Sequence, residues 1–272
     1  YSNPNLQQIP ARNKDLGPLI RSLFIPESGC EWGCFDYSQQ EPRLVVHFAA
    51  TTTGIKEDPS VKEIVENYAN NDIDFHKTVS DMAGINRFQA KTINLGLFYG
   101  MGKAKLQAEL GLSTKQEAEE LFNKYHDRVP FVRDLMNETS RWASREGEIR
   151  TLLGRGCRFD KWEPAQFGMH TPMTWEDAVK KYGENRIRRA FTYKALNKLI
   201  QGSAADMTKK SMLDLYKEGI IAHIQIHDEL DLSVESKEQA DKIIEIMENA
   251  VKLAVPNKVD YESGKTWGDI YG

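Results

Sequence analysis

Two aspartates far apart in the chain occupy positions where β-strands are expected to end. Asp36 closes the loosely alternating segment 29–36, and Asp228 lies in a polar bend within the alternating segment 220–235. Strands from opposite ends of a chain can pair in one sheet, which would bring the two carboxylates to one metal site. Mg²⁺ favours such oxygen ligands, and paired ions about 3.5–4 Å apart can stabilise both oxygens of a phosphoryl transfer. A single loop aspartate is more often a turn or helix cap, so this interpretation depends on the pair and its surroundings.

A second group of residues recurs at every fourth position. Arg87, Lys91, Leu95 and Tyr99 would form one stripe about 18 Å long on an α-helix, with two cations before two large apolar groups. Such a helix can hold a triphosphate by its charge and a base by stacking, without a glycine-rich phosphate loop. An ordinary amphipathic helix with solvated cations has the same spacing, so the stripe alone leaves both interpretations open.

The elements expected to position these residues form a sheet interrupted by a helical insertion. The first predicted elements are a strand ending near Asp36 and a helix from about Gln39. The insertion is predicted to contain helical segments between Val61 and Tyr125 with a Thr114/Glu117 capping box, a helix between Pro130 and Gly147, a hairpin at 148–159 and an irregular stretch to about Gly183. The last predicted elements are a long helix from about Ile187 to Lys217, a hairpin at 220–235 and an amphipathic helix from Ser236 to about Leu253. Strands at both ends of the chain predict an α+β fold.

Composition bounds the possible partners. Hydrophobic residues make up 40% of the 272 residues, charged residues 28%, and the mean hydropathy is −0.56, values typical of a soluble globular protein. No apolar run is long enough to cross a membrane and no signal peptide is present. The formal charge of −4 gives no overall basic signature, so contacts with nucleic acid would have to be local. Cys30, Cys34 and Cys157 lack zinc-site spacing, and we expect free thiols without chemistry in a reducing compartment.

Three segments together resemble the family A DNA polymerases, and the resemblance covers nearly the whole chain. The matching segments are Asp36-Tyr37-Ser38-Gln39-Gln40-Glu41-Pro42-Arg43 (motif A), Arg87 through Lys91, Leu95, Gly96 and Tyr99 to Gly100 (motif B), and His227-Asp228-Glu229 (motif C), with supporting matches at Pro4 to Pro10, Thr151 to Arg155, and Asn197 to Asp206. The resemblance implies a right-hand polymerase architecture: an antiparallel palm sheet packed by helices, with a mostly helical fingers insertion. We expect palm at 1–55, fingers at 56–190 and palm again at 191–272, without thumb and exonuclease domains.

The same resemblance assigns a role to individual residues. Asp36 and Asp228 would bind two Mg²⁺ ions, with Mn²⁺ as a substitute, together with the Tyr37 carbonyl, and Glu229 would support the site. The implied nucleotide-binding residues are Ser38, Gln39, Glu41 as the gate against a ribose 2′-OH, His76, Arg87, Lys91 as general acid for pyrophosphate, Leu95, and Tyr99 near the templating base. The implied DNA-binding residues are Arg12, Asn197, Gln201, Gln225 and His227.

Several positions depart from the family pattern. Leu95 stands where an aromatic residue is usual, which predicts altered sugar discrimination and slower incorporation. Gln40 and Pro42 replace the usual Ile and Leu, and Tyr193 stands where an Arg is common in the DNA polymerase I branch. These departures place the chain nearer the bacteriophage branch, so we expect a cytoplasmic location in a bacterium or phage-infected cell.

Other functional interpretations remain at this point. A single-subunit RNA polymerase would share the palm aspartates, although Glu41 and the motif C triplet argue against it, and the YxDD-like hairpin of a reverse transcriptase is absent from the sequence. The chain begins with Tyr1, and we expect a piece of a longer protein. A piece without a thumb would bind primer–template weakly and extend it poorly, so a non-catalytic DNA-binding role is the alternative. Expected partners are primer–template DNA, dNTPs and a processivity factor or other replisome proteins, with no membrane.

Overall fold

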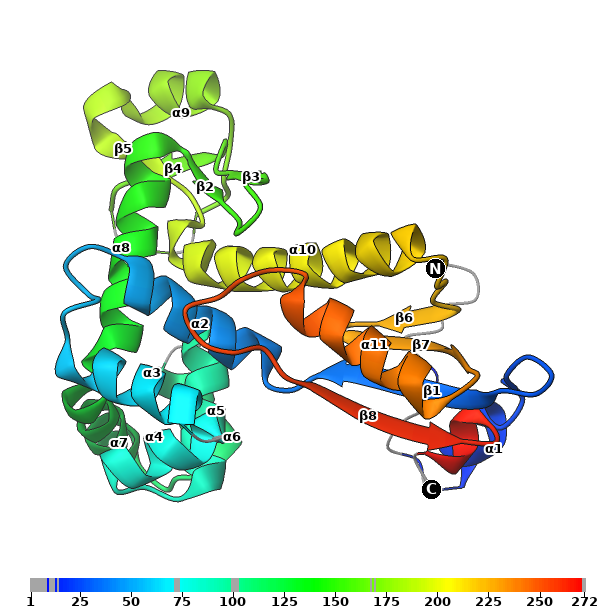
Figure 1. Ribbon diagram of the computed structural model, residues 1–272. Coiled ribbons are helices and arrows are strands. Elements are labelled where there is room, and N and C mark those ends of the chain that lie inside the picture. The colour runs from blue at the N-terminus through cyan, green and yellow to red at the C-terminus, as the bar shows by residue number, and fades with distance from the viewer. Residues whose placement is uncertain are drawn as a thin grey trace. The chain divides into compact units, whose positions relative to one another are not determined.

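The computed structural model describes residues 9, 13, 15–70, 74–98, 103–166, 168 and 170–270 (Figure 1). The chain forms two compact units: Tyr1–Arg43 with Ala204–Gly272, called here the sheet unit, and Leu44–Ser203, called here the helical unit. The divisions at 43/44 and 203/204 fall inside two helices, α2 (Gln40–Thr51) and α10 (Ala195–Lys217). From the sequence we predict the palm and fingers divisions elsewhere, at 55/56 and 190/191.

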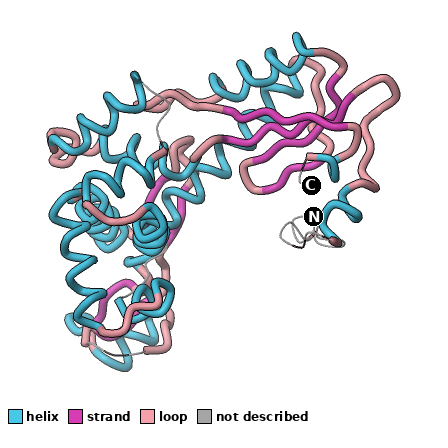
Figure 2. The backbone as a smooth tube through the Cα atoms, turned by 90° about the horizontal axis from the view of Figure 1, so that it is seen from below, coloured by secondary structure: helices cyan, strands magenta, loops and turns pink. Residues whose placement is uncertain are grey.

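The sheet unit contains a four-stranded antiparallel sheet in the order β6-β7-β1-β8. Figure 2 shows the strands of the chain in magenta. The strands are β1 (Glu31–Tyr37), β6 (Ile224–Ile226), β7 (Glu229–Val234) and β8 (Val259–Gly264). The predicted strand before residue 37 and the predicted hairpin at 220–235 are therefore confirmed, whereas β8 was not predicted. β1 lies between β7 and β8, so a residue at the end of β1 has neighbours from two distant parts of the chain.

One face of this sheet carries the apolar core. Phe35 pairs across the strands with Leu230 and Tyr261, and the rings of Phe35 and Tyr261 stack with centroids 4.7 Å apart. The Tyr37 hydroxyl hydrogen-bonds to Ser211 Oγ at 2.6 Å and donates to the Met247 carbonyl at 2.5 Å. These contacts join the sheet to α10 and to α11 (Lys237–Asn249), which lie beside it (Figure 1). α11 begins as predicted, because Ser236 accepts a hydrogen bond from the Gln239 N–H.

The opposite face has a second core in which aromatic residues lie next to carboxylates. Trp32 and Cys34 on β1 pack with Ile224 and Trp267, all of them buried. Arg21, at the end of α1 (Leu16–Arg21), lies over the Trp267 ring 4.4 Å from its centroid. The short 3₁₀ helix η4 (Trp267–Asp269) thus joins α1 to the sheet. Asp36 lies on this face, because side chains alternate along a strand.

The helical unit follows the predicted helices closely. The α7 capping box at Thr114 and Glu117 is confirmed, and α8 begins at Pro130 and ends at the left-handed Gly147. The predicted 148–159 hairpin is also confirmed. The elements of this unit include α3 (Pro59–Asn70), α4 (Phe75–Ala83), α5 (Arg87–Phe98), α6 (Lys103–Leu110), α7 (Lys115–Arg128), α8 (Pro130–Glu146), β2 (Glu148–Arg150) and β3 (Gly156–Arg158).

Two predictions in the helical unit are wrong. The stretch expected to be irregular contains β4 (Trp162–Pro164) and α9 (Trp175–Tyr182), which Thr174 caps. The helix expected from Ile187 begins at Ala195, after η2 (Glu184–Arg186), β5 (Ile187–Arg189) and η3 (Thr192–Lys194). The reason is that residues 187–189 pair with β4, and Phe191 adopts a left-handed conformation with φ of 64°, which interrupts a helix.

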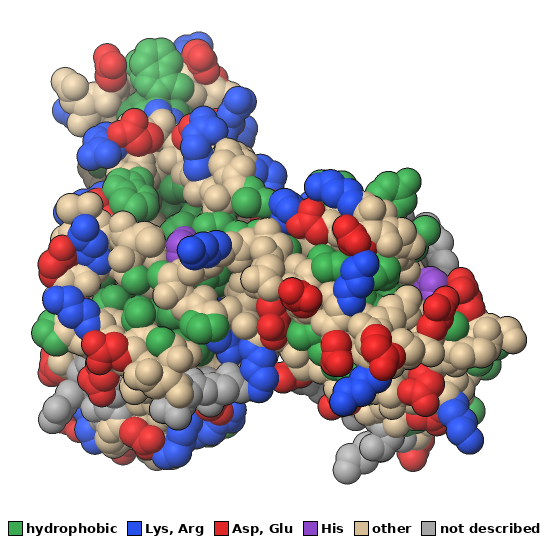
Figure 3. Space-filling view, viewed as in Figure 1, with side chains coloured by type: hydrophobic (Ala, Val, Ile, Leu, Met, Phe, Trp, Pro, Cys, Tyr) green, Lys and Arg blue, Asp and Glu red, His purple; other side chains and the backbone are tan. Residues whose placement is uncertain are grey.

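No helix in the described ranges is both long enough and apolar enough to span a membrane. Acidic and basic side chains are interspersed over α11 and β8 on the face shown in Figure 3. This distribution agrees with the absence of an overall basic signature in the composition.

Candidate active site

The sheet brings Asp36 and Asp228 together. Asp36 lies opposite Glu229 in the register of β1 and β7, and Ile226 pairs with Glu229, so His227 and Asp228 form a two-residue turn. The Tyr37 N–H donates to the Asp228 carbonyl at 3.4 Å, which fixes the turn against the end of β1. Two carboxylates separated by almost two hundred positions therefore lie side by side at one end of the sheet.

The turn that carries Asp228 has an unusual backbone. His227 has a φ of 52°, a conformation that non-glycine residues seldom adopt and that costs about 1–3 kcal/mol. The Gln225 side chain donates a hydrogen bond to the His227 carbonyl at 2.7 Å and so holds the turn. The predicted DNA-binding residues Gln225 and His227 are thus also the residues that shape the Asp228 turn.

The surroundings of Asp36 oppose its ionisation. Burial raises its pKa to about 7, and the negative charges of Asp228, Glu229, Asp260 and then Glu262 add to this effect. The pKa of Asp228 is also raised, mainly by burial. Carboxylates that oppose each other's charge in this way are stabilised by a bound cation, and their oxygen ligands suit Mg²⁺. The donor set therefore fits the divalent metal that the sequence predicts.

The residues following Asp36 form a tight connection to α2. The Ser38 N–H donates to the Lys258 carbonyl at 2.9 Å, and Arg43 Nε donates to the Ser38 carbonyl at 2.8 Å. Gln39 has a φ of 54°, and Glu41 lies half-buried in the first turn of α2. Motif A therefore continues the strand into a helix through a bend in which Ser38, Gln39 and Glu41 stay partly accessible.

The helical unit gathers three of the predicted triphosphate ligands. Arg87 and Lys91 are both exposed one turn apart on α5, whereas Ala90 and Ile93 face the core, so the predicted cationic stripe is solvent-facing. Both cations lie close enough to His76 to lower its pKa. Three groups able to bind phosphate oxygens therefore lie together in this unit.

An aspartate holds Arg87 in place. Asp74 caps α4 by accepting hydrogen bonds from the His76 and Lys77 N–H groups, at 2.9 and 3.2 Å. Its other oxygen forms an ion pair with Arg87, with Nε and Nη2 at 2.6 and 2.5 Å. Burial opposes the ionisation of Asp74, but the hydrogen bonds from Arg87 and the Lys77 N–H outweigh it and lower the pKa. Arg87 thus has a fixed orientation beside His76.

His76 is buried, uncharged and oriented. Burial lowers its pKa to about 4, and Lys91 and Arg87 act in the same direction against the opposing charge of Asp74. Asn94 Nδ2 lies 3.0 Å from His76 Nδ1, and the Tyr125 hydroxyl donates to Asn94 Oδ1. Because the amide nitrogen can only donate, His76 Nδ1 accepts and the ring proton lies on Nε2. This chain leaves Nε2–H as a neutral donor.

The remaining predicted residues divide between the units. Asn197 is half-buried and Gln201 exposed near the start of α10, in the helical unit. Arg12 and Tyr99 lie outside the described residues, and so does the side chain of Leu95, whose backbone is part of α5. The Asp36 group belongs to the sheet unit and the Arg87 group to the helical unit, and each is described within its own unit.

Three residues of the Arg87 group were not predicted from the sequence as site residues: Asp74, Asn94 and Tyr125. Asp74 precedes His76 by two positions, and a capping aspartate at that spacing would have been a usable signal. Asn94 and Tyr125 are thirty-one positions apart, so no local pattern marks either of them.

Comparison with known proteins places the chain in a family. Residues 1–269 match the sequence model of DNA polymerase family A. The chain belongs to DNA polymerase family A, and the expected resemblance is confirmed.

Its relatives include phage and bacterial proteins. A DNA-directed DNA polymerase of Pseudomonas phage M6 is 34% identical over 99% of this chain and 43% of its own length. DNA polymerase I of Bacillus caldotenax is 35% identical over 98% of this chain and 29% of its own length. The chain therefore spans less than half the length of these relatives.

A solved structure shows the same fold. The POL domain of Pol1 from M. smegmatis, in complex with DNA primer-template and dNTP, matches the whole chain with a TM-score of 0.77 at 28% identity, over 46% of that structure's chain. The predicted α+β fold with an antiparallel sheet is thereby confirmed.

Proposed function

We propose that the chain is the catalytic core of a DNA-templated DNA polymerase, which joins a dNTP to a primer 3′-OH and releases pyrophosphate during DNA replication or repair. The observation that carries this proposal is that Asp36 and Asp228 lie side by side at one end of the sheet. Both carboxyl groups have raised pKa values, which a bound cation would lower. Family membership supports the reaction type. The names of the relatives and the contents of the M. smegmatis complex support DNA and dNTP as substrates.

The carboxylates of Asp36 and Asp228 and the carbonyl of Tyr37 would hold two Mg²⁺ ions, and Mn²⁺ would substitute. When bound, these ions neutralise charge that develops on the reacting phosphate oxygens. Glu229, opposite Asp36 in the sheet, maintains the negative charge around the pair. The Tyr37 side chain is fixed by Ser211 and Met247, so its carbonyl has a defined direction.

The proposed ligands of the triphosphate are Arg87, Lys91 and His76. Arg87 and Lys91 supply positive charge, and neutral His76 donates its Nε2 proton to a phosphate oxygen without adding another charge to a basic cluster. Lys91 also protonates the departing pyrophosphate. Ser38 and Gln39 line the nucleotide site, Glu41 excludes a 2′-OH, and Leu95 and Tyr99 contact the sugar and base.

Primer–template contacts are assigned to Arg12, Asn197, Gln201, Gln225 and His227. Neutral amide and imidazole groups of this kind can bind minor-groove acceptors and backbone oxygens, where sequence is hardly distinguished. Such contacts suit an enzyme that copies any template.

Single-nucleotide primer extension with Mg²⁺ tests this proposal. Asp36→Asn and Asp228→Asn should each lower the rate by about 10³-fold or more, since metal stabilisation of the transition state is worth several kcal/mol. Asp260→Asn is the matched control, because Asp260 lies beside Asp36 on β8 but forms an ion pair with Lys258 at 3.5 Å. We expect it to retain activity within a few-fold. Equal losses in all three variants would contradict the assignment, and primer–template binding without turnover in the wild type would favour a binding role.

A further inference from the structure

Behind the candidate active site, the same face of the sheet holds a second group of ligating side chains. Cys34 lies opposite Asp231 in the register of β1 and β7, and Asp36 lies opposite Glu229 one repeat further along. Cys34 Sγ and one carboxylate oxygen each from Glu229 and Asp231 all lie within 4.8 Å of one another. Separations of this size allow three ligands to reach one ion.

Asp231 is the member of this group that requires an explanation. It is 0% exposed, and no hydrogen bond of normal geometry reaches either of its carboxylate oxygens within the described part of the chain. A buried carboxylate without a partner costs several kcal/mol, so native structures provide it with a donor, a proton or a metal. Trp32, Cys34 and Glu229 lie next to the Asp231 carboxyl, and none of these three groups is a cation.

The neighbourhood leaves one open side. Trp32, Ile224 and Trp267 pack with Cys34 in one buried cluster, so this side of the group is apolar. Glu229 is half-buried, so an ion and a water ligand can enter from its side. Three protein ligands with one water is a common arrangement for Zn²⁺, whereas an all-oxygen ligand set suits Mg²⁺.

We propose that Cys34, Glu229 and Asp231 form a binding site for a thiophilic divalent cation such as Zn²⁺, separate from the Mg²⁺ site of Asp36 and Asp228. Binding displaces the thiol proton of Cys34 and any proton on the carboxyl groups. The bound ion also gives the Asp231 carboxylate a partner. The site would also fix Glu229, which both groups share. The proposal stands apart from the proposed polymerase activity, because its test measures metal binding.

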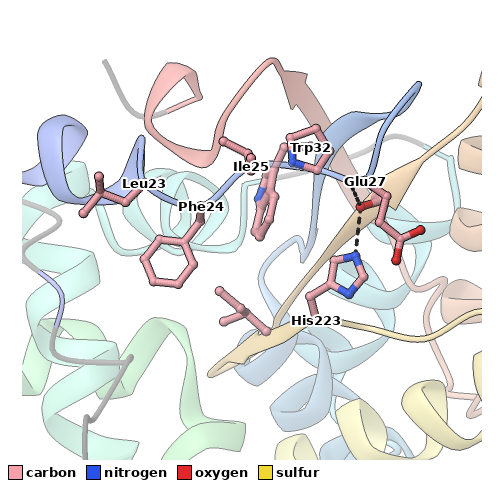
Figure 4. A pocket seen from close by; sticks show the side chains of 9 residues that line it. Leu23, Phe24, Ile25, Glu27, Trp32 and His223 are labelled. Carbon is pink, nitrogen blue, oxygen red and sulfur yellow. Dashed lines mark hydrogen bonds between the residues drawn. The ribbon is translucent and has the colours of Figure 1, made fainter.

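A cavity of about 480 Å³ shares Trp32 and Ile224 with the buried cluster. It is lined by Leu23, Phe24, Ile25, Trp32 and His223 among others, and the Glu27 N–H and His223 Nε2 both hydrogen-bond to Ser233 Oγ (Figure 4). Nothing in the structure shows what would cover its apolar wall.

Cobalt binding to the chain tests the proposed site. Metal-free protein in excess Mg²⁺ is titrated with Co²⁺ under anaerobic conditions, and the thiolate-to-cobalt charge-transfer absorption is recorded. We expect a band that saturates at one equivalent and disappears when Zn²⁺ is added. A wild-type protein that gives no such band overturns the proposal, because the three groups would then hold protons only.

Matched variants identify the ligands. Cys34→Ser should abolish the band and Asp231→Asn should weaken Co²⁺ binding at least tenfold, whereas the double variant Cys30→Ser/Cys157→Ser should keep the wild-type band. Asp36→Asn should also keep it, which separates this site from the proposed catalytic metals. A band that survives Cys34→Ser, or that is lost in the Cys30/Cys157 variant, overturns the assignment. Circular dichroism and thermal melting check that each variant folds. If Cys34→Ser does not fold, the titration of the wild-type protein decides whether the site binds metal.

Discussion

Asp36 occupies its place in the sheet at a cost in free energy. Its pKa in the folded protein is about 7, against an ordinary value of 3.8, because burial and four neighbouring carboxylates oppose its charge. A folded-state pKa above the unfolded value means that the native protein binds more protons between these two values. Stability should therefore fall as pH rises from about 4 to about 7, and the full penalty remains above that window.

The substitution Asp36→Asn removes this charge and gives the first prediction. Without divalent metal, Asp36→Asn should be more stable than wild type at pH 8, on the order of 1–2 kcal/mol after allowance for the partial solvent exposure of the carboxyl. The difference should vanish below pH 4, and saturating Mg²⁺ should stabilise wild type but not the variant. Thermal melting across pH measures both effects. A stability difference that is the same at pH 4 and pH 8 would show that the charge of Asp36 is not its cause.

A second prediction concerns the residues that orient His76. Tyr125→Phe leaves Asn94 Oδ1 without its buried donor, so it should lower the free energy of unfolding by about 1–2 kcal/mol. With Asn94 free to turn, His76 loses its fixed tautomer, and the KM for dNTP should rise several-fold more than kcat falls. Steady-state primer extension and urea unfolding give the two values.

Tyr216→Phe provides the control for this prediction, because Tyr216 is 66% exposed on α10. It should change neither stability nor KM appreciably. If Tyr125→Phe loses stability but keeps the wild-type KM, the hydroxyl only supports the core and has no role in orienting His76.

Among the elements, β1 is the most constrained. A Cβ at Gly33 would lie 2.5 Å from Val234 Cγ2 and 3.1 Å from ring carbons of Phe35 and Tyr261. The strand can therefore lie between β7 and β8 at this spacing only because position 33 has no side chain. Asp36 follows three residues later, so the position of β1 also fixes the position of the carboxylate.

The third prediction tests this crowding. Gly33→Ala should destabilise the chain by about 1–3 kcal/mol through overpacking. Gly156→Ala on β3 is the matched control, because its added Cβ meets only one carboxylate oxygen of Glu148, at 3.3 Å, and it should cost less than about 0.5 kcal/mol. Urea unfolding compares the two, and equal losses would show that strand propensity rather than crowding is responsible.

The elements that were predictable carry their own local signals. The Thr114 and Glu117 capping box, Pro130 at a helix start and Gly147 at a helix end depend on neighbouring residues alone, so sequence identifies them. Residues 187–189 have helical propensity but pair with β4, and this pairing is a tertiary contact that periodicity does not report. β8 was missed for a related reason, because its outward residues are polar and its partner is more than two hundred positions away.

The same division applies to the candidate site. Asp36 and Asp228 were predictable because motif order and strand alternation mark them. The Tyr125–Asn94–His76 chain and the burial of Asp231 were not, since both depend on packing between distant segments. Cys34 was expected to be inert, and only the register of β1 and β7 brings it opposite a carboxylate.

At the scale of the whole molecule, two compact units carry different parts of the proposed chemistry. The sheet unit holds the carboxylates, and the helical unit holds the cations and His76. The formal charge of −4 offers no long-range attraction to DNA, and the chain covers 43% of the phage M6 polymerase. Residues 1–272 alone should therefore bind primer–template weakly, at about 10⁻⁶ M or above at physiological salt.

Fluorescence anisotropy with a labelled primer–template measures this affinity and tests the fourth prediction. Binding should weaken further as salt rises, with a shallow slope that reflects few phosphate contacts. Nanomolar affinity, or processive extension by residues 1–272 alone, would show that the chain grips duplex DNA by itself.

The central claim is that Asp36 and Asp228 act as one metal-binding unit in nucleotidyl transfer. Single-turnover incorporation by Asp36→Asn, Asp228→Asn and the double variant tests it most directly, in a chain that extends a primer measurably. The effects of substituting two groups that act as a unit do not add. The rate of the double variant should therefore equal that of the slower single variant within a few-fold, and both should be about 10³-fold or more below wild type. Losses that multiply in the double variant, or a rate that either single change leaves near wild type, would contradict the claim.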